Sequence, residues 1–140
     1  MQNKSVFMLS NILLPLLAGA SLYVISSPNV IFLRYFKLRV DVASEFINVY
    51  IWFWPILRNY IPDMLWGYSL VFAVYMIIDD DNAASMRILI YVLVFSIFLE
   101  LLQLLPTVPG TFDLLDMLVE GVAEILAVII IKKYEEASET

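Results

Sequence analysis

Residues 97–124 read IFLELLQLLPTVPGTFDLLDMLVEGVAE, and this stretch decides the fold. An apolar segment carries Glu100 and Gln103 near its end, a Pro/Gly turn follows, and a second apolar segment contains four acids. These acids are Asp113, Asp116, Glu120 and Glu124. Apolar runs on both sides of a short turn predict two antiparallel helices. Because an acid inside an apolar helix is costly, the four side chains indicate a paired or functional site.

The composition is typical of an integral membrane protein. Of 140 residues, 62% are hydrophobic and the mean hydropathy is +0.87, whereas a soluble domain has roughly 45–50% apolar residues. The length fits a single domain, residues 1–140. A net charge of −6 without a basic patch argues against nucleic acid as a partner. The chain has no His and no Cys, which excludes His/Cys metal sites, Cys nucleophiles, His bases and disulfides.

The hydropathy pattern predicts an all-α, polytopic membrane protein with four transmembrane helices, at about residues 6–26, 61–78, 86–105 and 112–131. The first span resembles a signal peptide, but its uncharged run is longer than the usual ~7–15 residues, so we expect a retained helix. Pro15 and Gly19 predict a kink and a face for close helix approach, with Asn11 beside them in a packing role. Pro62 favours the first turn of the second span.

The connections carry two further signals. The first connection is rich in Trp and Tyr, which mark the membrane–water interface, and we expect residues 42–54 to form an interfacial helix on the membrane. The run Asp79-Asp80-Asp81-Asn82 predicts a loop with helix caps, since its spacing is not that of a calcium loop. The chain from Tyr134 to Thr140, YEEASET, is predicted to be a polar, frayed tail.

The positive charges near the span ends predict the orientation. Lys4, Arg87 and Lys132-Lys133 lie on one predicted side, whereas the 106–112 turn contains no Lys or Arg. This asymmetry favours both termini in the cytoplasm. The first connection opposes this trend, because it places positive charges on the outer side, namely Arg34, Lys37, Arg39 and Arg58.

The four acids of the last span share one helix face. At about 100° and 1.5 Å per residue, they stay within about 60° of Asp113 and form a stripe about 16 Å long. Asp113 and Asp116 lie at a helix N-terminus, where the helix dipole favours negative charge. Glu120 and Glu124 lie past the first turn. For these two we expect either a partner's positive charge or a neutral, protonated carboxyl group.

An up-down order of the four spans brings the start of the second span to the same end as the 106–112 turn. We therefore predict an outer polar cluster there, made of Arg58, Asn59, Asp63, Glu100, Gln103, Asp113 and Asp116, with Glu120 and Glu124 deeper. Arg58 is the expected counter-ion of the acids.

Three interpretations of this cluster remain open. The first is an interhelical hydrogen-bond network that fixes the bundle, and the second is an outward-opening cleft for a polar or cationic ligand. The third is a metal-assisted active site on a lipid headgroup, with Mg²⁺ or Mn²⁺ at the acidic cluster and a carboxylate or water as the base. No other cofactor is indicated.

Three segments carry a family resemblance. They are LRNYIPDMLWGYSL (Leu57–Leu70), ELLQ (Glu100–Gln103) and GTFDLLD (Gly110–Asp116). Over residues 57–128 the chain resembles the VanZ-like family of small bacterial membrane proteins. The resemblance implies a four- or five-helix membrane protein and a link to low-level resistance to lipoglycopeptide antibiotics such as teicoplanin. It matches Glu100, Gln103, Asp113 and Asp116 to the polar positions of the family.

The chain also departs from the family pattern at two places. The family usually has an Arg shortly before the first Asp, where this chain has Gly110-Thr111. It usually has an Asn after the second Asp, where this chain has Glu120.

Together these patterns predict a VanZ-like, non-catalytic protein of the bacterial inner membrane. We expect it to bind an envelope lipid, a lipid-linked ligand or a membrane partner through an outward-facing acidic cleft. One alternative is a metal-dependent enzyme acting on phospholipid or prenyl-phosphate headgroups, and another is an accessory subunit of a larger membrane complex. Membrane lipids are the expected partners. Because a chain of 140 residues has little surface to bury around so many acids, a homo-oligomer or a membrane-protein partner is also expected.

Overall fold

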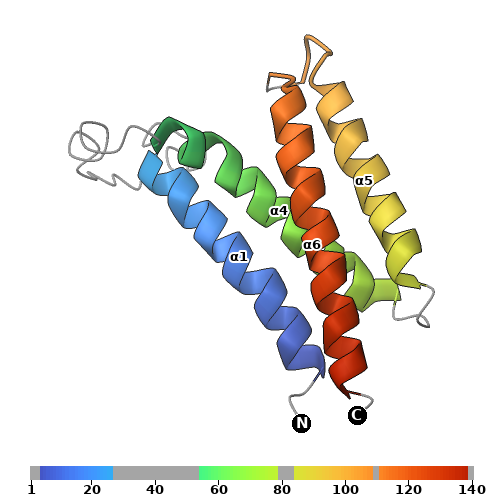
Figure 1. The fold of residues 1–140 in the computed structure, drawn as a ribbon. Coiled ribbons are helices and arrows are strands. Elements are labelled where there is room, and N and C mark those ends of the chain that lie inside the picture. Colours follow the sequence, from blue (N-terminus) through green and yellow to red (C-terminus); the bar gives the residue numbers. More distant parts are fainter. Residues whose placement is uncertain (1–3, 27–53, 79–83, 109–110, 139–140) are drawn as a thin grey trace.

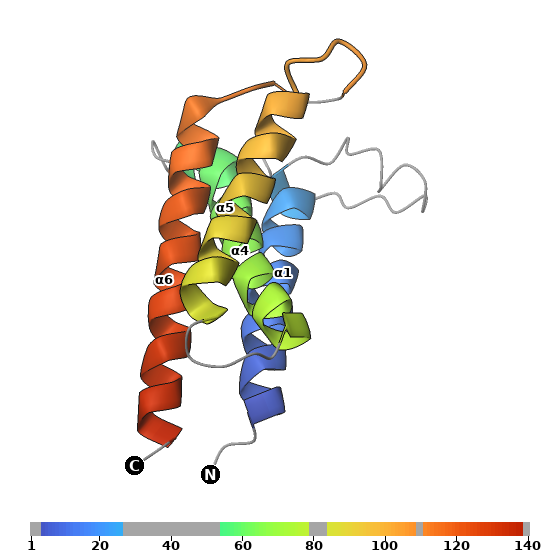
Figure 2. The ribbon, with the colours of Figure 1, turned by 90° about the vertical axis from the view of Figure 1, so that its right-hand side faces the viewer.

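The described part of the chain forms a bundle of four helices. The computed structural model describes residues 4–26, 54–78, 84–108 and 111–138. The helices are α1 (Lys4–Ser26), α4 (Trp54–Ile78), α5 (Ala84–Leu102) and α6 (Leu114–Ser138). They run alternately up and down, so that the start of α1 and the end of α6 lie at one end and the α5–α6 connection lies at the other (Figures 1 and 2). The predicted all-α fold class is therefore confirmed, and each helix overlaps one of the four predicted ranges.

The start of α4 differs from the prediction. The helix begins at Trp54 with Pro55 in its first turn, so Pro62 lies inside the helix and does not open it. Proline favours a first turn because the N–H that it lacks would be unpaired there in any case. From the sequence, either Pro55 or Pro62 could occupy the first turn of this helix, and the sequence alone did not discriminate between them.

Two other differences concern the end of α5 and the end of α6. α5 ends at Leu102, where predicted residues 103–105 instead form tighter turns, with the Leu105 N–H donating to the Leu102 carbonyl at 3.0 Å. Pro106 follows, and a residue before proline is disfavoured in a helix. α6 continues past Lys132-Lys133 to Ser138, so the segment from Tyr134 to Ser138, predicted as a polar tail, is helical.

Two predicted features lie outside the described residues. The interfacial helix at residues 42–54 lies outside the described residues, apart from Trp54, where α4 begins. The aspartate run at residues 79–81 and Asn82 also lie outside them.

The apolar core occupies the half of the bundle nearest the chain ends. Its buried residues come from all four helices: Met8, Val71, Phe72, Tyr75, Ile88, Val92, Ala127, Val128 and Ile131. At the same end Phe7 of α1 stacks on Tyr134 of α6, with ring centroids 3.9 Å apart. The Tyr75 hydroxyl donates to a carboxylate oxygen of Glu135. Apart from polar contacts such as that of Tyr75 with Glu135, apolar packing thus closes this half of the bundle.

α1 packs along α4 through the residues that the sequence indicated. A side-chain carbon at Gly19 would lie 3.7 Å from Leu65 and 3.8 Å from Pro62, so the two backbones approach closely there. The Tyr68 hydroxyl donates to the Asn11 side-chain oxygen at 2.7 Å, and the Asn11 amide donates to the Phe7 carbonyl at 2.9 Å. The predicted close approach at Gly19 and the packing role of Asn11 are confirmed.

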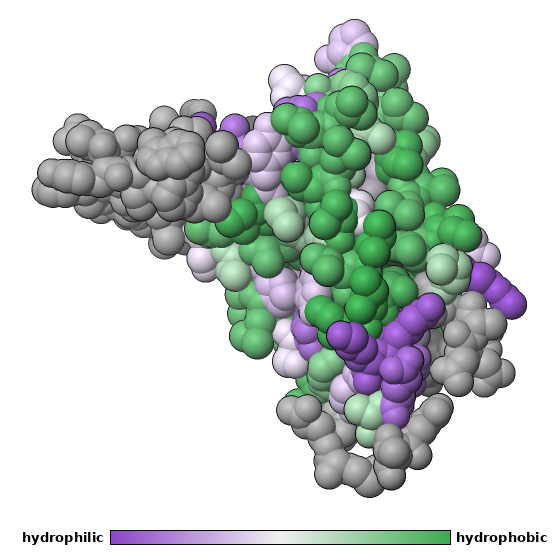
Figure 3. Space-filling model, in the orientation of Figure 1, coloured by the Kyte–Doolittle hydropathy of each residue, from purple (hydrophilic) through white to green (hydrophobic). Residues whose placement is uncertain are grey.

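The sides of the bundle are strongly apolar. Exposed large side chains include Leu14 (67%), Phe98 (55%) and Leu118 (58%), and hydrophobic residues cover most of the face that α5 and α6 present in Figure 3. Within the described residues, two segments, Lys4–Leu22 and Arg58–Ile78, are long and apolar enough to cross a membrane.

Candidate functional site

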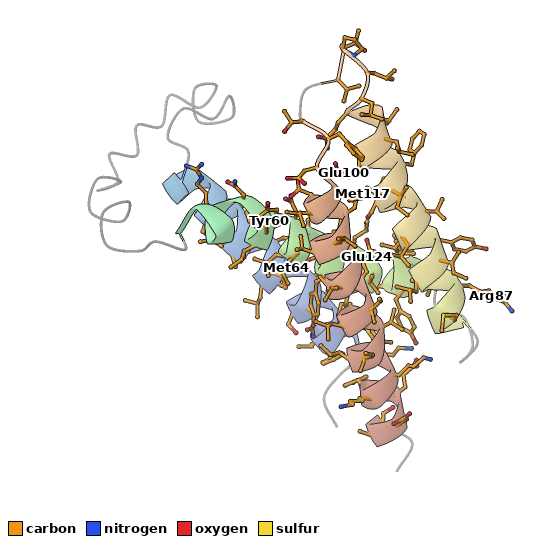
Figure 4. All side chains as sticks on the ribbon, turned by 45° about the horizontal axis from the view of Figure 1, so that its top comes forward. Tyr60, Met64, Arg87, Glu100, Met117 and Glu124 are labelled. Carbon is orange, nitrogen blue, oxygen red and sulfur yellow. The ribbon has the colours of Figure 1, made fainter. Side chains whose placement is uncertain are left out.

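A cavity of about 490 Å³ opens at the end of the bundle opposite the chain ends. The start of α4, the end of α5 and the start of α6 meet there. The lining residues are Arg58, Asn59, Tyr60, Pro62, Asp63, Glu100, Gln103, Thr111, Asp113 and Asp116. All seven residues predicted for the outer polar cluster are among them. In Figure 4, Tyr60 on α4 and Glu100 on α5 lie towards this end, whereas Arg87 lies at the other end of α5.

Asp113 and Asp116 are positioned by the start of α6. The Leu115 N–H donates to a carboxylate oxygen of Asp113 at 2.9 Å, so Asp113 is the N-cap of the helix. Asp116 lies in the first turn, where the helix dipole favours negative charge. The predicted location of both acids at a helix N-terminus is confirmed.

Glu100 and Gln103 form a local pair at the end of α5. The Gln103 side-chain amide donates to Glu100 Oε1 at 2.9 Å, and the Gln103 N–H donates to the Glu100 carbonyl at 3.1 Å. The second carboxylate oxygen of Glu100, Oε2, is buried and has no hydrogen-bond partner among the described residues. Glu100 is therefore held in place, with one buried carboxylate oxygen that is unpaired among the described residues.

Arg58 shares the cavity with four acids but forms no ion pair with them among the described residues. Its Nε donates to the Asn59 side-chain oxygen at 3.3 Å, and the side chain is exposed. Within the part of the chain that the structure describes, no ion pair joins Arg58 to the lining carboxylates. The predicted counter-ion is thus at the site without a direct contact, and the lining carries more negative than positive charge.

Glu120 and Glu124 lie beyond the cavity lining, deeper in the bundle. Their side chains are 6% and 0% exposed. The Ser96 hydroxyl of α5 donates to Glu124 Oε1 at 2.7 Å, and Glu124 Oε2 has no partner among the described residues. Figure 4 shows Glu124 further along α6, away from the end where Glu100 lies.

Five contributors to the site were not predicted from the sequence. Tyr60, Pro62 and Thr111 line the cavity, Ser96 contacts Glu124, and Gly67 lies against Glu120. For Ser96 a signal was available, because it lies four residues before Glu100 and therefore on the same helix face. For Gly67 the available signal was the absence of a side chain in an apolar span, which allows close helix approach.

The chemistry of the cavity is that of fixed acceptors and negative charge. Carboxylates accept hydrogen bonds only, and a charged donor such as an ammonium or guanidinium group forms the strongest bonds to them. In the ranges that the structure describes, no group of three or more acidic side chains converges to hold a metal ion. No protein-family model, curated protein or solved structure matches this chain.

Proposed function

We propose that this protein is a membrane-embedded binding protein that receives the cationic headgroup of an envelope lipid or lipid-linked molecule in its acidic cavity. One observation carries the proposal. A cavity of about 490 Å³ is lined by Asp63, Glu100, Asp113 and Asp116, at the end of a bundle with apolar sides. Among the described residues that line it, Arg58 is the one basic residue. The volume falls within the roughly 300–1,000 Å³ of ligand pockets.

All four helices span the membrane in this proposal. α5 has 19 residues and α6 has 25, which correspond to about 28 and 37 Å of helix against a hydrocarbon core of about 30 Å. The acids of α6 do not argue against a span, because Glu120 and Glu124 are buried inside the bundle while neighbours such as Leu118 and Val122 are exposed. Polar groups inside and apolar groups outside is the arrangement expected in lipid.

The same proposal assigns an orientation in a bacterial inner membrane. Lys4, Arg87 and Lys132-Lys133 belong to the end of the bundle that holds the chain ends, whereas the connection around the cavity has no Lys or Arg between residues 103 and 113. Positively charged flanks favour the cytoplasm. The cavity therefore faces outward, towards the envelope.

A cationic group is favoured as the ligand over a purely structural hydrogen-bond network. A network that fixes the bundle would join the acids across helices. The hydrogen bonds of Glu100 and Asp113 instead stay within their own segments, and Glu100 keeps an open buried acceptor. Tyr60 also lines the cavity, and an aromatic ring is a group that attracts cations.

The resemblance to the VanZ-like family supports the same site. The four positions that match the family, Glu100, Gln103, Asp113 and Asp116, all line the cavity. We propose a divergent VanZ-like protein, and the link to lipoglycopeptide resistance stays a prediction from that resemblance.

Binding of a simple cationic amphiphile tests the proposal. The purified chain in zwitterionic nanodiscs is titrated with dodecylamine, and with dodecanol as the neutral control of equal chain length. We expect saturable dodecylamine binding above that of empty nanodiscs, weakened by salt because charges near the cavity mouth are screened. Dodecanol should show none.

Two charge-removing variants locate the binding. Glu100→Gln and Asp113→Asn keep the shape of the site, and Asn still caps a helix. Each should weaken dodecylamine binding about tenfold, since the loss of one charged hydrogen bond corresponds to about 1.4 kcal/mol. Glu136→Gln, at the exposed far end of α6, is the matched control and should bind as the wild type does. Equal binding of dodecanol, or unchanged binding in both cavity variants, would refute the proposal.

A further inference from the structure

The two deep acids of α6 have few of the groups that usually stabilise a buried negative charge. Among the described residues, the Ser96 hydroxyl is the hydrogen-bond donor beside both acids. Glu124 is fully buried, accepts one hydrogen bond from Ser96, and has a second oxygen without a partner in the described ranges. Glu120 is 6% exposed and packs against Gly67, with its Oε1 3.4 Å from where a side-chain carbon at Gly67 would stand. A buried carboxylate with so few donors costs several kcal/mol.

Among the described residues, the charged groups that face this pair all carry the same sign. α4 contributes Asp63 and α5 contributes Glu100, and both interact electrostatically with Glu120. α6 contributes the other member of the pair. α1 packs on α4 and contributes no charged neighbour to the pair within the described residues. Two ionised carboxylates would thus repel each other and their neighbours in an apolar setting.

The geometry selects the kind of cation that neutralises them. A metal ion needs several oxygen ligands, and no such group converges among the described residues. A proton needs one carboxylate oxygen, and Glu124 Oε2 offers one. We propose that the Glu120–Glu124 pair is a proton-binding site, in which Glu124 is a neutral acid with its hydrogen on Oε2 and the Ser96 hydroxyl donates to the carbonyl oxygen Oε1.

Protons reach this site from the cavity and not from the other end of the bundle. Asp63 and Glu100 line the cavity and are electrostatic neighbours of Glu120, so acidic groups continue from the cavity to the pair. Past Glu124, α6 continues into the buried apolar core with Ala127, Val128 and Ile131. The step is a reversible exchange: the carboxylate takes a proton from cavity water and returns it there.

Infrared spectroscopy of the full chain in lipid nanodiscs at neutral pH tests the site without any ligand, so its outcome does not depend on the proposed function. We expect a carbonyl absorption of a protonated carboxylic acid in the wild type. It should disappear in Glu124→Gln and persist in Glu136→Gln. The absence of this absorption in the wild type, or its persistence unchanged in Glu124→Gln, would overturn the proposal.

A second variant tests the assignment of the absorption to Glu124 if Glu124→Gln folds poorly. Ser96→Ala removes the hydrogen bond to the carbonyl oxygen, so the absorption should move to higher frequency without being lost. An unshifted absorption would contradict the assignment to Glu124. Circular dichroism and detergent elution profiles confirm that each variant is folded.

A proton-leak assay tests whether protons reach the pair from the cavity alone. Vesicles that contain the protein and a trapped pH dye should leak protons no faster than empty vesicles, because the apolar core blocks a through path. A leak that Glu124→Gln abolishes would overturn this part of the inference.

Discussion

Replacing Gly67 with alanine should destabilise the bundle, because the new methyl group would meet Glu120. An alanine Cβ at this position would lie 2.5 Å from Glu120 Cγ and 3.3 Å from the Glu120 backbone oxygen. The first contact is shorter than any normal carbon–carbon approach, and Glu120 is buried and has little room to move. Gly67 therefore sets the distance between α4 and α6 where the deep acids lie.

The expected magnitude is a balance of two effects. Overpacking in a well-packed interior costs about 1–3 kcal/mol. Replacing glycine with alanine inside a helix stabilises the folded state by about 1 kcal/mol, because alanine has the higher helix propensity. Gly19→Ala is the matched control, since its nearest contacts at 3.7 Å are ordinary ones and only the favourable effect remains. The two variants should thus differ in free energy of unfolding by about 1–3 kcal/mol.

The assay is reversible unfolding in mixed micelles with increasing dodecyl sulfate, followed by circular dichroism. Glu120→Ala removes the Cγ atom that blocks the methyl group, so Gly67→Ala should be tolerated in that background. The double-mutant cycle should give a coupling of about 1–3 kcal/mol, as for residues in direct contact. Equal effects of Gly67→Ala and Gly19→Ala, or additive effects in the cycle, would refute the close contact.

Three further changes test other parts of the structure. Tyr68→Phe removes the hydroxyl that donates to Asn11 at 2.7 Å, and it should lower the free energy of unfolding by about 1 kcal/mol in the same assay; no loss would contradict the contact between α1 and α4. Asp113→Ala removes the N-cap of α6 and should cost about 0.5–2 kcal/mol, whereas Asp113→Ser should retain most of the stability; equal stabilities would argue against capping. The chain has no cysteine, so Thr107→Cys and Ser138→Cys each provide a single label, and a membrane-impermeant reagent on intact cells should reach only the cysteine at position 107. Labelling of the one at position 138 alone would reverse the proposed orientation.

The outer site could be predicted because it depends on topology and charge alone. Four helices in up-down order bring the start of one helix, the end of the next and the start of the last to the same end. The positions of Arg58, Glu100 and Asp113 in the sequence then predict that they meet. The N-cap role of Asp113 follows from its position just before an apolar run, which is local information.

The inner site could not be predicted in full because it depends on packing between helices. That Ser96 faces Glu124, and that Gly67 faces Glu120, depends on how α5 and α4 are rotated against α6. Strongly apolar helices reveal this rotation poorly, because exposed and buried positions are both hydrophobic. Helix bounds failed for a related reason: Pro55 and Pro62 are equally acceptable at a first turn, and only tertiary context selects between them.

The outer and inner acids are stabilised in different ways, and this difference links the two proposals. Asp113 has a helix N-terminus and Glu100 has Gln103, and both border an open cavity. Among the described residues, Glu124 has only the Ser96 hydroxyl as a hydrogen-bond donor, and in our proposal a proton takes the place of a counter-ion. A cationic headgroup in the cavity would offset the charges of Asp63 and Glu100, the same charges that disfavour ionisation of Glu120. A bound cation therefore makes it easier for the pair to release its proton. Because such coupling is reciprocal, extra protons must in turn weaken cation binding. Dodecylamine should therefore bind less tightly as the pH falls. The double variant Glu120→Gln/Glu124→Gln, which neutralises the deep pair, should show a weaker pH dependence of dodecylamine affinity. The part of the pH dependence that comes from the cavity acids should remain.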